Sequence, residues 1–209
     1  MKAQWHQRLT NGAAALGVTL TDKQVQQLLD YLQELHKWNR AYNLSAIRDP
    51  DLMLQRHLLD SLAVLPHLQA GRVIDVGTGA GLPGIVLAIC QPATQITLLD
   101  SNGKKTRFIF HVKTLLQLDN VQVENCRVEQ HQPDELYQVV ISRAFASLAD
   151  MTSSCRHLLG EGGVFYAMKG VYPEAELEQA EALCQLQTGI RLQVPGEVGE
   201  RHLLVLRPV

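Results

Sequence analysis

The chain has few of the features that mark secreted, metal-binding or membrane proteins. It contains only four cysteines, and no two of them form a C-x-x-C pair, so the sequence supports neither a zinc nor a redox motif. No window approaches the roughly 20 consecutive apolar residues of a membrane span, and residues 1–10 lack the apolar core of a signal peptide. We therefore expect a cytoplasmic protein with reduced thiols, no metal and no contact with a membrane.

The sequence also has little excess of either charge. Its 19 Lys and Arg side chains and 21 Asp and Glu side chains give a formal net charge of −2. The whole molecule therefore provides no attractive field for nucleic acid, and any such contact requires a local basic patch. With 209 residues, 46% of them hydrophobic, the chain is expected to form one globular domain with a small appendage and to work as a monomer.

Residues 1–70 are predicted to form an N-terminal helical extension. Residues 21–24 read Thr-Asp-Lys-Gln, which has the form of a capping box, and apolar residues then recur at helical spacing as far as Trp38. A second helix is expected over residues 50–65, ended by Pro66.

From Arg72 the pattern changes to alternating strands and helices. Strands are predicted at 72–76, 95–99, 121–123, 138–142, 163–168 and 202–207, and helices at 82–90, 104–118 and 148–158 and from Pro173. This alternation predicts an α/β, Rossmann-like domain over residues 71–209, with a mostly parallel sheet and helices on both faces. The last strand has no helix after it, so we expect it to pair antiparallel at the sheet edge.

The most informative segment follows the first predicted strand. Residues 75–84 read Asp-Val-Gly-Thr-Gly-Ala-Gly-Leu-Pro-Gly, and four glycines in eight residues are more than a plain tight turn requires. As a bare string, Gly79, Gly81 and Gly84 satisfy the dinucleotide-binding pattern. Two cofactor classes therefore compete for this loop.

The position of the strand favours one of them. The dinucleotide fingerprint needs a strand that runs directly into its first glycine, whereas here Gly77 and Thr78 intervene. A register that starts at Gly77 instead places Asp75 at the strand end, where a carboxylate suits the positive charge of S-adenosylmethionine and would repel a pyrophosphate. We therefore expect Asp75 and the loop glycines, Gly77, Gly79 and Gly81, to bind S-adenosylmethionine.

Two later segments fit an adenosine cofactor. Asp100 closes the second strand, 19 residues after Gly81, where a carboxylate would accept hydrogen bonds from both ribose hydroxyls. After the third strand, Val128 would pack on the adenine ring, and Glu129 or the adjacent backbone would meet the edge of the ring. A solvated turn and an ordinary loop are the alternatives for these segments.

The residues after the fourth strand indicate the kind of acceptor. Residues 142–145 read Ser-Arg-Ala-Phe, which contains neither the Asn/Asp-Pro-Pro-aromatic segment of amino-group methylation nor the cysteine nucleophile of pyrimidine carbon methylation. An acceptor with a free lone pair, such as a ring nitrogen, needs no general base, and catalysis is then mostly alignment. Arg143 is the candidate orienting residue, and Phe145 would either stack on a base or belong to the core.

Basic side chains gather around this predicted site, while the helix after Pro173 is acidic. Such asymmetry suits a phosphate-binding face on a nearly neutral protein, although an ordinary solvated surface is the alternative. The candidates for RNA binding are Arg48, Arg56, His57, Lys104, Lys105 and Arg107.

Taken together, these motifs resemble those of the bacterial glucose-inhibited division protein B family, the small-subunit ribosomal RNA guanine-N7 methyltransferases. The resemblance covers about Trp38 to Val205. It rests on the glycine loop together with His-Lys-Trp-Asn at 36–39, Tyr-Asn-Leu at 42–44, Arg-His-Leu-Leu-Asp-Ser at 56–61, Leu-Asp-Ser at 99–101, Ser-Arg-Ala-Phe-Ala at 142–146 and Met-Lys-Gly at 168–170.

The resemblance implies a class I methyltransferase with a seven-stranded sheet. It also implies methylation of N7 of guanine 527, in the 530 loop of 16S rRNA, on naked rRNA or on a small ribosomal subunit. By the same resemblance the residues that contact S-adenosylmethionine are Gly77, Leu82, Val128, Glu129 and Arg143, with Asp100 near the ribose. No catalytic base is implied; His57, Asp60 and Lys169 match motif positions without an assigned role, and Lys169 joins the candidates for RNA binding.

Three other functions compete with this interpretation. The loop glycines would also serve an NAD-dependent oxidoreductase, and the same fold methylates proteins and small metabolites. A non-catalytic RNA-binding assembly factor that retains the fold is a third alternative, but the intact Gly77, Gly79, Gly81 and Asp100 argue against a decayed cofactor site.

Overall fold

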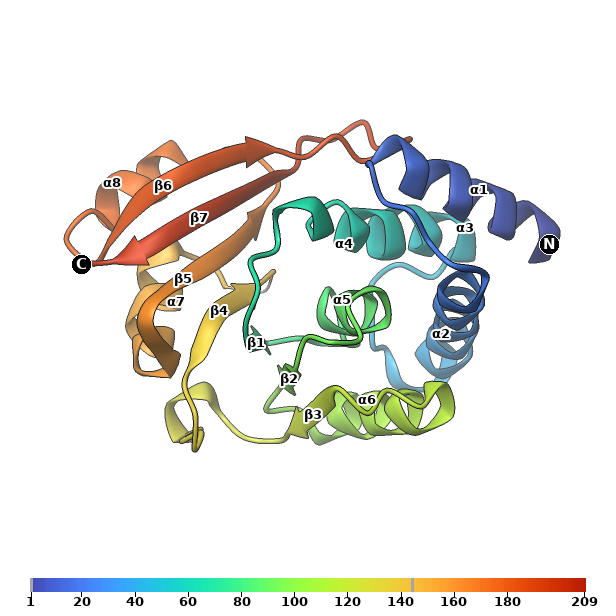
Figure 1. The fold of residues 1–209 in the computed structure, drawn as a ribbon, viewed down its shortest axis with the longest axis horizontal. Coiled ribbons are helices and arrows are strands. Elements are labelled where there is room, and N and C mark those ends of the chain that lie inside the picture. The colour runs from blue at the N-terminus through green and yellow to red at the C-terminus, as the bar shows by residue number, and fades with distance from the viewer. Residues whose placement is uncertain (1, 144) are drawn as a thin grey trace.

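Within residues 2–143 and 145–209, the part of the chain that the computed structural model describes, seven strands form one sheet in the order β3-β2-β1-β4-β5-β7-β6 (Figure 1). The first five strands are parallel, and β7 runs antiparallel to both of its neighbours. The strands are β1 (Val73–Val76), β2 (Ile96–Leu99), β3 (Val121–Glu124), β4 (Tyr137–Ser142), β5 (Leu159–Lys169), β6 (Cys184–Arg191) and β7 (His202–Pro208). The predicted Rossmann-like sheet is confirmed.

Helices cover both faces of this sheet (Figure 1). On one face lie α4, α5 and α6, with α1 and α2 outside them, and on the other face lie α7 and α8. The helices are α1 (Lys2–Ala15), α2 (Asp22–Tyr42), α3 (Pro50–Met53), α4 (Asp60–Leu62), α5 (Gly84–Cys90), α6 (Gly103–Leu116), α7 (Leu148–Cys155) and α8 (Glu174–Gln179). In these described segments, no helix combines the length and the hydrophobicity that crossing a bilayer requires.

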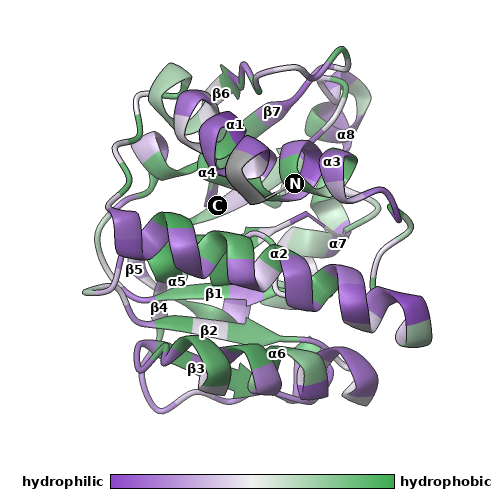
Figure 2. Ribbon diagram, turned by 90° about the vertical axis from the view of Figure 1, so that its right-hand side faces the viewer, coloured by the Kyte–Doolittle hydropathy of each residue, from purple (hydrophilic) through white to green (hydrophobic). Residues whose placement is uncertain are grey.

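The strands divide the core into two layers because successive side chains point to opposite faces of a sheet. Val139 and Ile141 of β4 belong to the cluster on the α5 and α6 face, whereas Val140 between them belongs to the cluster on the α7 face. Leu28 and Leu32 of α2 join the first cluster, so the N-terminal helices share a core with the sheet. Figure 2 shows α2 with alternating hydrophilic and hydrophobic residues in front of the predominantly hydrophobic α5 and β2. The division into residues 1–70 and 71–209 stays a prediction.

Helix α2 begins at the predicted capping box. The Thr21 hydroxyl accepts a hydrogen bond from the Gln24 backbone at 3.3 Å, and the Gln24 side chain accepts one from the Thr21 backbone at 2.9 Å. The helix expected over residues 50–65 is instead divided by a π-helical turn, η1 (Leu54–Leu59), in which the Asp60 N–H reaches back to the Gln55 carbonyl. The wider turn shifts the helical register, and both His57 within the turn and Asp60 directly after it are buried.

The position of the last strand corrects one expectation. β7 does not lie at the sheet edge, because its residues pair with Phe165–Lys169 of β5 on one side and with β6 on the other. The edge strand is β6, which the sequence did not predict. Most of its side chains are exposed, so it lacks the apolar alternation that marks a half-buried strand.

Candidate active site

The glycine loop joins β1 to α5 with a backbone that few other residues adopt. Gly77, Gly79 and Gly81 have φ angles of 68°, 63° and 92°, in the left-handed region that favours glycine. The Gly77 N–H donates to the Leu99 carbonyl of β2 at 2.9 Å, which ties the start of the loop to the neighbouring strand. The loop therefore lies at the carboxyl ends of the parallel strands, where sheets of this class bind ligands.

Asp75 holds this loop from beneath. Its side chain has no exposure, and one carboxylate oxygen accepts hydrogen bonds from the Thr78 hydroxyl at 2.7 Å and the Gly84 N–H at 2.8 Å. Burial raises the pKa of Asp75 to about 6. We expected Asp75 beside the cofactor, but it lines neither of the two cavities described below, because both hydrogen bonds turn it into the loop.

The helices around the loop fix it further. A Cβ on Gly81 would lie 2.5 Å from the Ile85 side chain, and a Cβ on Gly84 would lie 2.0 Å from Leu98, so both glycines allow close packing of α5. The wholly buried Tyr31 of α2 donates from its hydroxyl to the Ala80 carbonyl at 2.8 Å. Tyr31 was not predicted as a support of the loop, although a tyrosine on an apolar helical face is a signal that its hydroxyl has a partner.

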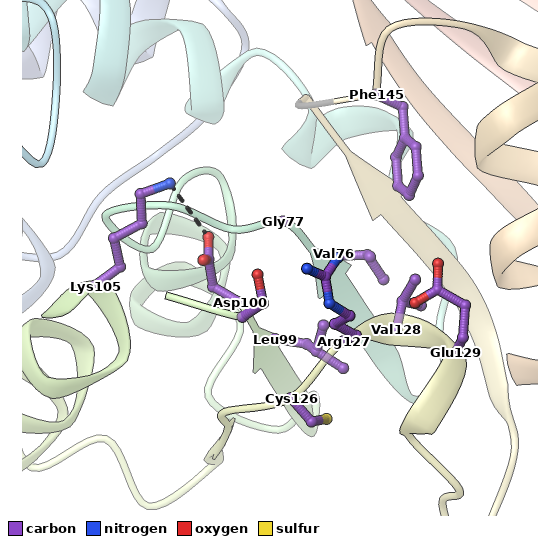
Figure 3. Close-up of a pocket in the computed structure, with 11 residues that line it drawn as sticks. Val76, Gly77, Leu99, Asp100, Lys105, Cys126, Arg127, Val128, Glu129 and Phe145 are labelled. Carbon is purple, nitrogen blue, oxygen red and sulfur yellow. Dashed lines mark ion pairs between the residues drawn. The ribbon is translucent and has the colours of Figure 1, made fainter. Parts of the chain in front are cut away.

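A cavity of about 300 Å³ opens beside the loop at the ends of β1, β2 and β3 (Figure 3). Asp100 projects into it: its carboxylate accepts hydrogen bonds from the N–H groups of Gly79 and Asn102, both at 2.9 Å, and lies 3.6 Å from the Lys105 ammonium. The lining residues are Val76, Gly77, Leu99, Asp100, Ser101, Lys105, Cys126, Arg127, Val128, Glu129 and Phe145.

Four of the residues predicted to bind the cofactor meet in this cavity: Gly77, Asp100, Val128 and Glu129. The short helical turn η3 (Val128–Gln130) presents a largely buried Val128 and an exposed Glu129. Phe145 lines the opposite wall (Figure 3), and its partly buried ring also packs against the core cluster on the α7 face.

A second cavity, of about 170 Å³, lies on the other side of the loop. Gly77 lines both cavities, so they adjoin at the first glycine. Three further predicted residues, Gly79, Leu82 and Arg143, line the second one. The remaining lining residues are Leu44, Ser45, His57, Thr78 and Ala80. Gly81 lines neither cavity and serves the packing of α5 instead.

His57 faces the second cavity as a neutral imidazole. Burial, followed by the charge of Arg143, lowers its pKa to about 4. The Arg56 carbonyl lies 3.1 Å from Nδ1 and can only accept, so the ring hydrogen belongs on Nδ1. Nε2 then accepts a hydrogen bond from the Ser45 hydroxyl at 2.8 Å. Ser45 was not predicted, because a single serine in a turn carries no pattern.

Arg143 is held in place by a buried carboxylate. One of its guanidinium nitrogens lies 3.3 Å from Asp60, whose side chain is only 5% exposed, and 3.3 Å from the Arg56 carbonyl. The other Asp60 oxygen pairs with Arg201 of the loop before β7 at 3.1 Å. Asp60 therefore connects three distant segments, and sequence reasoning missed Arg201 because nothing in the local pattern around it indicates a site.

Comparison with known proteins identifies the family to which this site belongs. The model of a family described as "rRNA small subunit methyltransferase G" matches residues 24–204. A protein of Cellvibrio japonicus named ribosomal RNA small subunit methyltransferase G is 58% identical over 206 residues, which cover 96% of this chain and 94% of that protein. One of the same name from Escherichia coli O17:K52:H18 is 50% identical, over 96% and 97% of the two chains.

The chain belongs to the rRNA small subunit methyltransferase G family.

Membership in the rRNA small subunit methyltransferase G family makes the chain an S-adenosylmethionine-dependent methyltransferase, so the interpretation as an NAD-dependent oxidoreductase is wrong. Solved structures agree on the fold. The DhpI–SAH complex matches with a TM-score of 0.58 at 16% identity, over 87% of this chain and 95% of that one. A methyltransferase from Geobacter sulfurreducens matches with a TM-score of 0.55 at 12% identity, over 72% and 90%.

The residues present fit the cofactor of the methyltransferase G family. A Cβ built on Gly79 meets nothing within 4 Å, so the loop backbone faces open space in which a ligand could lie against it. The first cavity has apolar walls that suit the base of a nucleoside and a carboxylate, that of Asp100, that suits its ribose hydroxyls. The volume of the cavity is at the lower end of the range of small-molecule sites. The two acids in that cavity, Asp100 and Glu129, also suit a cationic ligand.

The predicted RNA-binding residues do not form a single patch. Lys104 and Arg107 are exposed on α6, near the half-buried Lys105 at the rim of the first cavity. Arg48 is exposed and donates to Asn43, while Arg56 pairs with Glu197 at 3.0 Å. His57 is buried in the second cavity, and Lys169 pairs with Glu176 at 2.8 Å with a side chain only 14% exposed.

The neutral state of His57 predicts a pH dependence of stability. A histidine whose pKa falls from 6.5 to about 4 on folding binds fewer protons in the folded state, so its contribution is complete above pH 6.5 and is lost as the pH falls toward 4. This contribution amounts to about 3 kcal/mol. The His57→Gln variant should therefore show a smaller loss of unfolding free energy between pH 6.5 and 4 in urea titrations.

The raised pKa of Asp75 makes its contribution to the unfolding free energy change in the opposite direction over part of this pH range. This change occurs in both the parent protein and His57→Gln, so the difference between their pH profiles isolates His57. His6→Gln, at an exposed position, is the matched control and should follow the parent protein. Equal pH profiles for His57→Gln and the parent would contradict the neutral assignment.

Proposed function

We propose that the protein transfers the methyl group of S-adenosylmethionine to N7 of a single guanine, guanine 527 in the 530 loop of 16S rRNA. The assignment to small-subunit rRNA follows the family, and the choice of a ring nitrogen follows the chemistry of the second cavity. As a partner we infer 16S rRNA, on its own or in the small ribosomal subunit, and as location the cytoplasm. The protein is proposed to act as a monomer.

One observation carries the choice of acceptor. Among the described residues that line the second cavity there is neither a carboxylate nor a thiol, and the acceptor nitrogen of His57 is occupied by Ser45. A group that must lose a proton before methylation would find no free base there. Guanine N7 carries an exposed lone pair and needs none, so this cavity suits it.

The chain's own residues would then act by positioning. When bound, S-adenosylmethionine supplies a methyl group activated by a sulfonium. Asp100 is proposed to accept the ribose hydroxyls, Val128 to pack on the adenine and the backbone from Gly77 to Gly79 to line the path to the second cavity. Arg143 is proposed to orient the guanine or its phosphate. Alignment of this kind contributes up to several kcal/mol.

The exposed basic residues are proposed to bring the RNA to this site. Three basic residues, Lys104, Lys105 and Arg107, lie on α6 beside the first cavity. Arg48 donates a hydrogen bond to Asn43, and the next residue, Leu44, lines the second cavity. Phosphate contacts of this kind supply affinity without reading sequence, so their replacement should weaken binding uniformly and reduce its dependence on salt.

Mapping of N7-methylguanosine tests the proposal. Primer extension on 16S rRNA from cells that contain the protein should show a modified guanine 527, and rRNA from cells that lack it should not. In vitro, tritium from labelled cofactor should enter 16S rRNA and should not enter protein or small-metabolite pools. A methyl group that persists on guanine 527 in cells without the protein would exclude this function. Transfer of tritium to protein or to a small metabolite would show that the acceptor is a different molecule.

A further inference from the structure

Three side chains with ligand atoms for a metal lie together at the end of β3, beside the first cavity, and the proposed methyl transfer does not use them. Glu124 ends the strand, Cys126 follows it and His131 follows the turn η3. Their carboxylate, thiol and imidazole ligand atoms all lie within 4.8 Å of one another. The sequence predicted no metal because the cysteines are isolated, and only the folded chain brings these three residues together.

The histidine of this cluster already has a hydrogen-bond partner on one of its ring nitrogens, as metal-binding histidines typically do. Nε2 of His131 lies 3.0 Å from the Tyr137 hydroxyl, and that hydroxyl donates its hydrogen to Thr97 at 3.1 Å. The ring hydrogen of the neutral imidazole therefore belongs on Nε2, which leaves a free lone pair on Nδ1. A metal-binding histidine is typically oriented by such a hydrogen bond from its other nitrogen.

We propose that Glu124, Cys126 and His131 bind a zinc ion, with water as the fourth ligand. Thiolate and imidazole together favour zinc over magnesium or calcium, and three protein ligands leave one open tetrahedral position. Zinc–ligand bonds of about 2.0 to 2.3 Å place the ligand atoms of a tetrahedral site roughly 3.3 to 3.8 Å apart. Side-chain rotations that move these ligand atoms by about 1 Å would therefore bring all three to bonding distance of the ion. On binding, the Cys126 thiol loses its proton to solvent.

The site is joined to the cofactor cavity by two contacts. Cys126 lines that cavity (Figure 3). The Glu124 carbonyl accepts a hydrogen bond from the Asp100 backbone N–H at 3.2 Å. An ion that fixes Cys126 and Glu124 would therefore also fix this wall of the cavity. Zinc is expected to change the affinity for S-adenosylmethionine, and by linkage the cofactor changes the affinity for zinc by the same factor.

The experiment uses the untagged, full-length protein and Co²⁺ as a spectroscopic substitute for zinc. One equivalent of Co²⁺ should produce a thiolate-to-cobalt charge-transfer band in the near ultraviolet, which zinc then abolishes. The band should be absent in Cys126→Ser and unchanged in Cys90→Ser, a matched variant of another half-buried thiol. Calorimetry in two buffers should show one zinc site and the release of a proton.

The Tyr137→Phe variant separates a built site from adventitious binding. It leaves all three ligands in place but removes the partner of His131, and zinc affinity should fall about 10- to 100-fold. Absence of the cobalt band from the parent protein, or its persistence in Cys126→Ser, would overturn the proposal. These readouts do not involve RNA, so they are independent of the proposed methylation.

Discussion

Replacement of Asp100 with alanine is expected to weaken S-adenosylmethionine binding at least 100-fold. We propose that this carboxylate, which lines the first cavity, accepts both ribose hydroxyls, and it also holds the Gly79 N–H at 2.9 Å. The variant would therefore lose both proposed cofactor contacts as well as a tether of the loop. Hydrogen bonds to a charged group are worth about 1.5–3 kcal/mol each. The two bonds proposed to the ribose hydroxyls together amount to about 3 kcal/mol or more, which is at least a hundredfold in affinity.

Isothermal titration calorimetry with S-adenosylmethionine measures this effect. Asp100→Asn retains one acceptor oxygen and the shape of the side chain, so it should lose less affinity than Asp100→Ala. Asp119→Ala removes an exposed carboxylate in the turn before β3 and should bind as the parent does. If Asp100→Ala bound the cofactor within threefold of the parent, the placement of the nucleoside in the first cavity would be wrong.

The Arg143→Ala variant is expected to lose methyl transfer by about 100-fold. Arg143 lines the second cavity beside Gly77, and Asp60 holds its guanidinium there, which supports the proposed role of orienting the acceptor. Alignment contributes several kcal/mol to such a reaction, which accounts for a loss of this size. Single-turnover transfer of tritium from labelled cofactor into 16S rRNA measures it.

Stability has to be separated from catalysis in this variant, because removal of Arg143 leaves the buried Asp60 with Arg201 alone. Breaking a buried ion pair costs about 3–5 kcal/mol. The double variant Asp60→Asn/Arg143→Ala removes both charges, so it should regain stability in thermal unfolding without regaining transfer. Arg156→Ala, at an exposed position, should leave both unchanged. Recovery of transfer in the double variant would show that Arg143 acts only through the fold.

The local pattern of the sequence was sufficient for most of the sheet and for the cofactor loop. Short apolar runs and the four clustered glycines are determined by neighbours along the chain, and β1, the loop and α5 appear where they were predicted. The exceptions have physical causes. β6 is an exposed edge strand without apolar alternation, and the π-helical turn η1 changes a helical register without changing the helical pattern.

Two carboxylates that look alike in the sequence have different surroundings in the folded protein. Asp75 and Asp100 both close a strand and look alike in sequence, yet Asp75 is turned into the loop by Thr78 and Gly84, whereas Asp100 faces the cavity. The distinction depends on hydrogen-bond partners that only the folded loop supplies.

The sequence by itself determined the fold class, the cofactor and the family, because these depend on strand endings, glycines and motifs that are contiguous in the chain. Only the tertiary structure decided which side chains share a site: Ser45 with His57, Asp60 with Arg143 and Arg201, and Glu124 with Cys126 and His131. Such groupings arise from segments that pack together after folding. Contacts as distant as that between residues 60 and 201 leave no periodic signal along a single chain.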